Sequence, residues 1–316
     1  MSFLPPLGDA SLAAADLALV NSQEKRFRSY LGMSQIGAEC SRQLFYSFRQ
    51  VQRPAFDAAT LKRFADGHAS ELVAVARLGE IEGIELHAVD DAGEQFGFKD
   101  LGGHFSGHMD GVILGLLQAP KTWHVLEIKA SAKWADLDKA KKKFGDKNAL
   151  REWNATYYAQ AVLYMDYAGL DRHYTVVVSP GAREWTSVRT DADPAHAAVL
   201  KAKAERIIFT DTAPDRIGDS TNFKCRWCDF ANICHEGDMA ERNCRTCMNA
   251  EVLREGGWRC AQFGHELDKA AQELGCEHHR FLPSLVPGEQ IDAGPWGVKY
   301  NMGGSEWVDA GPECVA

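Results

Sequence analysis

The sequence lacks any apolar segment long enough to cross a membrane. Such a helix needs roughly 18 consecutive apolar residues, and no run here comes close. Residues 1–24 have no basic stretch, and Asp9 and Asp16 interrupt their apolar positions. We therefore expect neither a signal peptide nor a membrane partner for this chain.

The motifs of several enzyme classes are also missing. There is no Gly-x4-Gly-Lys-Ser/Thr loop, so we expect no P-loop motor in this chain. The sequence has neither the His-Glu-x-x-His pair of zinc proteases nor the Gly-x-Ser-x-Gly turn of serine hydrolases. Positive charge is not in excess either, because a net charge of −9 disfavours a protein that coats nucleic acid non-specifically.

What is present is typical of an ordinary globular protein. The chain has 316 residues, 45% hydrophobic and 25% charged, which suits roughly two domains. Its nine cysteines come without a secretion signal, so they indicate reduced thiols that bind metal rather than disulfides. We expect a cytoplasmic location in a bacterium or a phage-infected cell.

The apolar periodicity predicts an α/β protein with a mixed central sheet flanked by helices. Helical spacing covers residues 11–51 with a break at Gly32, 61–78 closed by Gly79, 148–167 and 194–208. A period of two predicts three or four strands within 84–131, and two more at 173–179 and 184–189. Residues after Pro287 are rich in glycine and polar side chains, which predicts a loosely ordered tail.

Two acids and a lysine are the main candidates for catalysis. In the strand that contains Glu127 and Lys129, alternation puts both side chains on one face with Val125. Asp110 is expected on the preceding strand, on the same side as His108 and Val112, and antiparallel pairing would bring it beside Glu127. Adjacent carboxylates repel, and a divalent cation removes that cost. The alternative is a strand with ordinary surface charges.

His68 is a candidate third ligand on the helix over 61–78. It falls on the face that we expect to be buried, with Leu61, Phe64, Leu72 and Val75. A histidine in such a place is either a hydrogen-bonded core residue or a metal ligand.

Polar and aromatic residues on the helix over 148–167 form the next candidate group. Gln160 and Tyr164 lie one turn apart, and aromatic residues share nearly the same face: Trp153, Tyr157 and Tyr167. This group is either an aromatic core stripe, or a polar pair near a phosphate with rings that stack on unpaired bases. Six lysines between 133 and 147 are likewise either a solvated face or phosphate contacts.

The cysteines divide into two sets of four, and Cys314 remains as a free thiol. The first set joins a distant residue to a tight run: Cys40, Cys225, Cys228 and Cys234. Four thiolates suit zinc and iron–sulfur clusters equally, and either would tie the first helices to the far end of the catalytic region.

The second set has the spacing of a structural zinc module: Cys244, Cys247, Cys260 and Cys276. His265, His278 and His279 are rival fourth ligands, and four unrelated buried thiols are the alternative. Losing this metal is expected to loosen mainly the segment after Glu236.

In this order, His68, Asp110, Glu127-Ile128-Lys129 and Gln160-x3-Tyr164 resemble the RecB-like branch of the PD-(D/E)xK nucleases. Cys40, within Glu39–Tyr46, and Cys225-x2-Cys228-x5-Cys234 resemble its iron–sulfur subgroup, which includes the CRISPR-associated RecB-like exonucleases. The resemblance covers roughly residues 30–236. Met109 stands where the family often has proline.

The resemblance implies a restriction-endonuclease-like core and a role for each matched residue. His68, Asp110 and Glu127 would bind Mg²⁺ or Mn²⁺ with the carbonyl of Ile128, and Lys129 would be catalytic. Gln160 and Tyr164 would support the site and DNA, and the first cysteine set would hold a [4Fe–4S] cluster. The expected regions are 1–56 (N-terminal helices), 57–222 (nuclease core), 223–236 (cluster cysteines), 237–286 (zinc module) and 287–316 (tail).

The resulting function hypothesis is a metal-dependent DNA exonuclease. We expect it to act on single-stranded or free ends in recombination, replication or repair, with a recombination or helicase protein as a further partner. One alternative is a catalytically idle nuclease fold that serves as a DNA-binding or assembly subunit. Another is a CRISPR adaptation nuclease that trims new spacers.

Overall fold

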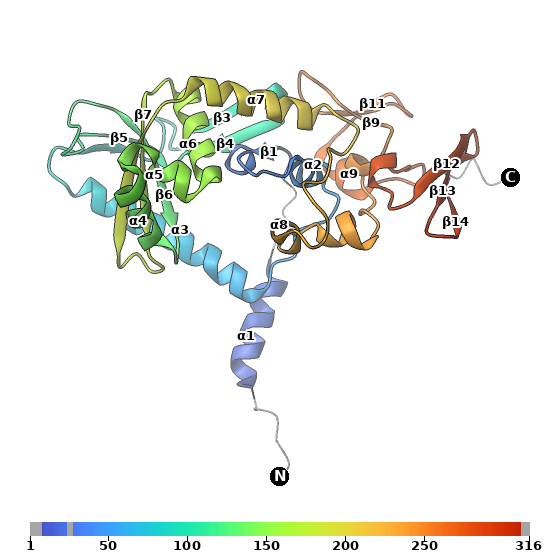
Figure 1. The fold of residues 1–316 in the computed structure, drawn as a ribbon, viewed down its shortest axis with the longest axis horizontal. Helices are drawn as coiled ribbons and strands as arrows, with labels where there is room; N and C mark the ends of the chain where they lie inside the picture. The colour runs from blue at the N-terminus through green and yellow to red at the C-terminus, as the bar shows by residue number, and fades with distance from the viewer. Residues whose placement is uncertain (1–7, 24–27, 311–316) are drawn as a thin grey trace, which may run out of the picture.

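A five-stranded mixed sheet forms the centre of the computed structural model, which describes residues 8–23 and 28–310. The strand order is β2-β5-β6-β7-β8, with β6 and β7 parallel and the other neighbours antiparallel. Helices lie on both sides of this sheet (Figure 1), so the predicted mixed sheet with flanking helices is confirmed. The strands are β2 (Glu85–His87), β5 (Gly111–Leu114), β6 (His124–Ala130), β7 (Arg172–Val178) and β8 (Trp185–Asp191).

The two faces of β6 enter two different hydrophobic clusters. Val125 packs in the cluster that includes α6 (Ala155–Ala168), whereas Leu126 and Ile128 pack in the cluster that includes α3 (Ala58–Gly79). Because side chains alternate along a strand, Glu127 and Lys129 share the α6 side. The predicted faces of this strand are confirmed, as is its antiparallel pairing with β5, where Val112 lies opposite Val125.

The chain breaks the helix predicted over 148–167 into two. Asn154 is extended, and its side-chain oxygen accepts hydrogen bonds from the backbone N–H groups of Thr156 and Tyr157, which begins a new helix. The prediction missed this cap because apolar residues continue on both sides of it. The helix over 194–208 is confirmed as α7. The helices in this region are α4 (Trp134–Phe144), α5 (Asp146–Trp153), α6 and α7 (Pro194–Ile208).

Asp110 lies between two sheets rather than within one strand, so placing it on a strand with His108 and Val112 was wrong. Residues 84–131 hold five strands, and two of them pair outside the central sheet, as β1-β4-β3. The chain enters the central sheet at Gly111, whose φ is 155° and where a Cβ would lie 2.5 Å from the carbonyl oxygen of His87. These elements are β1 (Leu31–Gly32), β3 (Gly97–Asp100), η2 (Leu101–Gly103) and β4 (Phe105–His108).

The N-terminal part contains two helices, with Gly32 between them in β1, as predicted. The first, α1 (Ala10–Asn21), has no buried residue and projects from the body in Figure 1. The second, α2 (Ser41–Arg49), buries Leu44, Phe45 and Phe48, and η1 (Met33–Gln35) precedes it.

The cysteine-rich part is built from short elements beside α2. They include a three-stranded antiparallel sheet and several single turns. In order they are α8 (Phe223–Arg226), η3 (Asn232–Glu236), η4 (Cys244–Thr246), β9 (Ala250–Val252), β10 (Trp258–Cys260), β11 (His265–Leu267), α9 (Lys269–Leu274) and η5 (Pro283–Leu285).

The described part of the tail predicted to be loosely ordered is a folded sheet, so the prediction was wrong for these residues. Residues 289–309 form an antiparallel sheet, with Val298 and Tyr300 buried in the main cluster. Its polar outer face and its glycines at turns gave it the composition of a disordered segment. The strands, at one end of the molecule in Figure 1, are β12 (Glu289–Gly294), β13 (Gly297–Asn301) and β14 (Glu306–Asp309).

The main hydrophobic cluster runs from Leu31 to Tyr300 and crosses most of the predicted domain boundaries. The division into domains therefore stays a prediction. None of the described helices is long and apolar enough to span a membrane. Cys314 lies outside the described residues.

Candidate active site

The predicted acids and lysine meet at β6 and the start of β5. Asp110 accepts a 2.7 Å hydrogen bond at Oδ2 from the backbone N–H of Ile128, which fixes this carboxylate against β6. Lys129 donates to Oε1 of Glu127. Glu127 is 3% exposed, and its Oε2 atom is buried with no hydrogen-bond partner among the described residues. The acid–acid–lysine group expected from the strand pattern is therefore assembled.

Helix α6 supplies the predicted polar pair on the same side of the sheet. The Gln160 side chain donates a 2.8 Å hydrogen bond to Oε1 of Glu127, and the Tyr164 hydroxyl lies within hydrogen-bonding reach of Gln160. Tyr164 fits closely because Gly107 has no side chain, since a Cβ there would lie 2.8 Å from the Tyr164 hydroxyl. Both residues of α6 are buried, so they position the acid rather than meet solvent.

Glu71 on α3 is a third acid that the sequence-based prediction missed. It is half-buried and senses the charges of Asp110, Lys129 and His68. His68 precedes it by three residues on the helix, so the two side chains are neighbours. The three-residue spacing from His68, which was already a candidate ligand, is the sequence signal that could have identified Glu71.

The predicted buried face of this helix was wrong, and His68 does not lie in the core. Phe64 and Leu72 are 48% and 72% exposed, whereas Ser70, Ala74 and Leu78 are buried. His68 is exposed, and its charge acts on the neighbouring Glu71, whose pKa it lowers. The prediction followed Phe64 and Leu72, but α3 packs on the sheet with Ala74 and Leu78, and Val75 is partly buried against the same cluster.

Burial and mutual repulsion govern the charges of the site. Burial raises the pKa of Glu127 to about 8; Lys129 works against this shift and Asp110 adds to it. Burial raises the pKa of Asp110 and of Glu71, and Asp110 raises that of Glu71 further. Burial alone would lower the pKa of Lys129, but Glu127 and Asp110 outweigh it and raise that pKa. We take Lys129 as a charged member of the group.

A divalent cation would suit this arrangement. Three carboxylates share the site, each disfavoured by burial, and Glu127 has an oxygen without a partner. Oxygen donors of this kind are what Mg²⁺ and Mn²⁺ prefer. Among the described residues, no three His, Cys, Asp or Glu side chains are already placed as metal ligands. The suitability of the site for Mg²⁺ or Mn²⁺ therefore rests on the chemical type of its oxygen donors.

Of the predicted aromatic residues, Tyr157 contacts the site, whereas Tyr167 and lysines of the run have partners elsewhere. Lys129 stands over the ring of Tyr157 at 5.2 Å, and Tyr167 donates a 2.5 Å hydrogen bond to Asp100. Lys141 donates to the carbonyl of Ser187 at 2.6 Å, and other lysines of the run pair with Asp136 and Asp191. Contact between the run and phosphate stays a prediction.

The two cysteine sets line two separate cavities, one beside each end of α2. Cys40, Cys225, Cys228 and Cys234 line the first. Burial raises the pKa of Cys225 and Cys228, and the thiols of Cys40 and Cys234 raise it further. The second cavity is lined by Cys244, Cys247, Cys260 and Cys276 together with His278 and His279, but not by His265. The division into sets matches the one predicted from spacing.

Comparisons with known proteins find only distant likenesses. No protein-family model and no curated protein matches the chain. The solved structure of SSO0001 is 15% identical and covers 71% of this chain and 94% of its own, with a TM-score of 0.39. LHK-Exo in complex with dAMP is 16% identical and covers 62% of this chain and 90% of its own, with a TM-score of 0.39; LHK-Exo is an alkaline exonuclease from Laribacter hongkongensis.

A phage related exonuclease from Haemophilus somnus 129PT is 14% identical and covers 57% of this chain and 92% of its own, with a TM-score of 0.39. Likenesses this distant support no statement about the activity of this chain, so its function has to be inferred from the geometry of the site.

Proposed function

We propose that this protein is a metal-dependent nuclease that hydrolyses phosphodiester bonds. The observation that carries the proposal is the group of Asp110, Glu127 and Lys129 at β6. Glu127 is buried, and its Oε2 atom has no hydrogen-bond partner among the described residues. Gathering like charges in a buried place costs free energy. A strand with a purely structural role gains nothing from that cost, whereas a metal-binding site requires it.

The residues have distinct roles in this proposal. Asp110 and Glu127 hold Mg²⁺ or Mn²⁺, assisted by His68, Glu71 and the carbonyl of Ile128. The cation, when bound, activates water and neutralises charge on the phosphate.

Around that centre, other side chains orient the acids and stabilise charge. Lys129 stabilises the negative charge that develops on the phosphate. Gln160 keeps Glu127 in place through its 2.8 Å hydrogen bond, and Tyr164 supports Gln160. Asp110 is oriented by the backbone N–H of Ile128.

The finer proposal is a DNA exonuclease that acts on single-stranded ends in recombination, replication or repair. It rests on the resemblance of the motifs to RecB-like nucleases. Tyr157, half-exposed beside Lys129, is a suitable ring for stacking on an unpaired base near the cut.

We propose further that the first cysteine set holds a [4Fe–4S] cluster. In support, its four thiols line one cavity, and the backbone N–H of Phe230 points to the sulfur of Cys228. Hydrogen bonds of this kind stabilise metal-bound thiolates. The cluster would tie the start of α2, where Cys40 is the N-terminal cap residue, to residues 225–234.

The test is a cleavage assay on DNA labelled at either end. Linear single-stranded, linear double-stranded and circular single-stranded DNA are incubated with Mg²⁺, Mn²⁺ or EDTA, and RNA of the same sequence is included. We expect products from linear single strands with either metal and none with EDTA. Glu127→Gln, which keeps the shape of the side chain, is the matched inactive control.

The same assay separates the alternatives. Cleavage of the circular single strand, which has no ends, would show that the protein is an endonuclease rather than an exonuclease. Intact DNA under every metal, combined with a mobility shift on single strands, would favour the idle DNA-binding subunit and overturn the proposal. The nuclease itself would also be overturned if Glu127→Gln cleaved as fast as the wild type.

A further inference from the structure

The second cavity gathers thiols from three separate elements. Cys244 and Cys247 bracket the single turn η4, Cys260 ends β10, and Cys276 follows α9. A turn and an antiparallel hairpin that bring cysteines to one cavity are typical of structural zinc sites. Nothing in the proposed nuclease chemistry uses these residues.

Backbone donors already face the sulfurs of this cavity. The N–H groups of Asn249 and Arg280 point to the sulfur of Cys247, and that of Gly275 points to Cys244. Such hydrogen bonds orient and stabilise thiolates that hold a metal. The Cys244 thiol donates a 3.2 Å hydrogen bond to the carbonyl of Ala271, a contact that it would give up on binding the ion as a thiolate.

The histidines near this cavity have other contacts. His279 pairs through Nε2 with the hydroxyl of Thr246 at 3.1 Å and packs edge-on against Phe281 at 4.5 Å, and its Nδ1 is buried with no partner among the described residues. His278 packs edge-on against Phe263 at 5.1 Å, and His265 stacks on the same ring outside the cavity. We choose Cys276 as the fourth ligand because its thiol, like that of Cys260, is close enough to raise the pKa of both Cys244 and Cys247.

We propose that Cys244, Cys247, Cys260 and Cys276 bind one Zn²⁺ ion through four thiolates, in a structural site separate from the first cysteine set. The proposal is independent of the nuclease function, because no residue of this site touches the acids at β6. Four sulfur ligands around a closed position are the usual composition of structural zinc.

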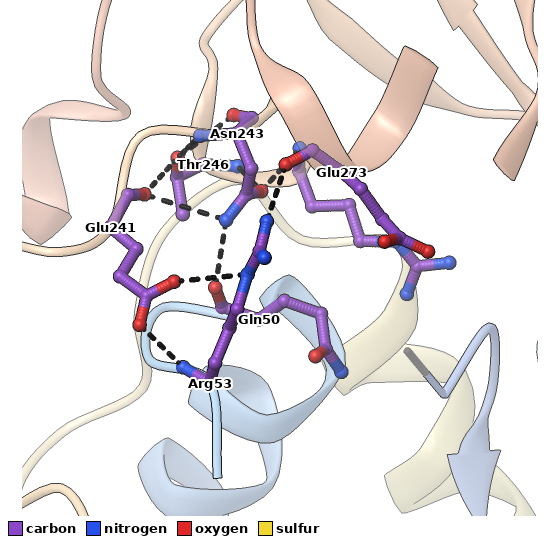
Figure 2. Close-up of polar contacts among 7 residues, drawn as sticks. Gln50, Arg53, Glu241, Asn243, Thr246 and Glu273 are labelled. Carbon is purple, nitrogen blue, oxygen red and sulfur yellow. Dashed lines mark hydrogen bonds and ion pairs between the residues drawn. The ribbon is translucent and has the colours of Figure 1, made fainter. Parts of the chain in front are cut away.

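The site also holds the end of α2, through the loop that leads into η4 (Figure 2). The backbone N–H of Glu241 donates to the carbonyl of Val51 at 2.7 Å, and its carboxylate accepts from the N–H of Arg53 at 2.7 Å. The Asn243 side chain donates to the carbonyl of Gln50 at 2.8 Å.

The first cysteine set lies at the start of α2, which begins after Cys40. The second set lies near its other end, because Asn243, next to Cys244, bonds to Gln50 just after Arg49. Losing the zinc would release Asn243 and Glu241 from the C-terminal end of α2. The expectation that mainly the segment after Glu236 would loosen does not take account of these contacts.

The first experiment measures metal and ligands on the full chain, purified without oxygen. We expect about one zinc per chain, with X-ray absorption at the zinc edge showing four sulfur neighbours at about 2.3 Å. Cys247→Ser and Cys260→Ser should each lose the zinc, and Cys314→Ser, outside both sets, should keep it. Wild type without zinc, a nitrogen neighbour at the zinc, or full zinc in Cys247→Ser would each overturn the proposal.

The second experiment follows backbone hydrogen exchange in the wild type and in Cys260→Ser, which removes a ligand of the zinc and leaves the first cysteine set intact. Exchange should rise in residues 41–53 as well as in 237–282, while α7 stays unchanged as the internal control. A rise confined to 237–282 would overturn the coupling to α2.

Discussion

At the scale of single residues, Glu127 is held by donors on one oxygen only. Lys129 and Gln160 both donate to its Oε1, and its Oε2 stays unpartnered among the described residues. An unpaired buried carboxylate oxygen is costly. A cation bound to Oε2, or a proton on it, would therefore stabilise Glu127 in this buried position.

Replacing either charged residue of this pair should remove cleavage. We expect Glu127→Ala and Lys129→Ala each to slow cleavage at least about a hundredfold, because electrostatic groups of this kind contribute roughly 2–4 kcal/mol to the transition state. Rates on end-labelled DNA with Mg²⁺ measure this. Lys121→Ala removes an exposed lysine outside the 133–147 run and should change little. A similar loss there, or near-normal rates in the first two variants, would refute the assignment.

His68→Ala should weaken metal binding and leave stability nearly unchanged. The side chain is exposed and adjoins Glu71, and surface substitutions usually change stability by about 0.5 kcal/mol or less. The Mg²⁺ concentration for half-maximal cleavage should rise, with the melting temperature constant. A large drop in melting temperature with unchanged metal dependence would show a packing role instead.

His173 should make the protein less stable in acid. It is 1% exposed, and burial lowers its pKa to about 3, from 6.5 for the free side chain. The folded state keeps it neutral, whereas the unfolded chain gains a proton. Its contribution to the free energy of unfolding is therefore complete above pH 6.5 and is lost as the pH falls toward 3. The loss is about 1.4 kcal/mol per pH unit.

Urea unfolding between pH 7 and 5 measures this effect. His173→Gln should flatten the fall in the free energy of unfolding, and His87→Gln, which replaces an exposed histidine, should not. Equal slopes in the wild type and His173→Gln would contradict the prediction.

At the scale of elements, the start of α6 decides where Gln160 points. Asn154→Ala removes the cap that accepts from Thr156 and Tyr157. We expect a loss of about 0.5–2 kcal/mol in the free energy of unfolding, together with slower cleavage, because Gln160 would no longer hold Glu127 firmly. Thermal melting and the cleavage rate test it, with Asn148→Ala in the preceding helix as the control. An unchanged melting temperature would show that packing alone places α6.

At the scale of the whole molecule, a buried arginine joins the cysteine-rich part to the N-terminal helices. Arg245 is 1% exposed and donates to the carbonyls of Phe48 and Ser29 at 2.9 and 2.8 Å. It also stands over the ring of Trp258 at 4.8 Å. One hydrogen-bonded cation thus joins segments about two hundred residues apart in the sequence.

Removing this arginine should destabilise the entire fold. Arg245→Ala leaves the buried carbonyl of Phe48 and the buried side-chain oxygen of Gln272 without this donor, at about 1–3 kcal/mol each, so the free energy of unfolding should fall by several kcal/mol. Arg259→Ala, which breaks an exposed pair with Glu251, should cost about 1 kcal/mol or less. Urea unfolding of both variants measures the difference. Equal small losses would mean that Arg245 does not join the two parts.

The sequence by itself determined the features that depend on local alternation. The placement of Glu127 and Lys129 on one face of β6, its antiparallel pairing with β5 and the bounds of α7 all result from periodicity and a short connection. The division of eight cysteines into two sets also came from spacing, because each set already contained a close pair.

Only the tertiary structure decided which distant residues meet. Glu71 joins the acids because α3 packs on the sheet through Ala74 and Leu78, a face that the apolar pattern of that helix did not indicate. Asp110 sits at the passage between two sheets, and the strands after Pro287 fold because Tyr300 finds a core built by other segments. Such contacts depend on chain segments far apart in sequence, and local periodicity carries no information about them.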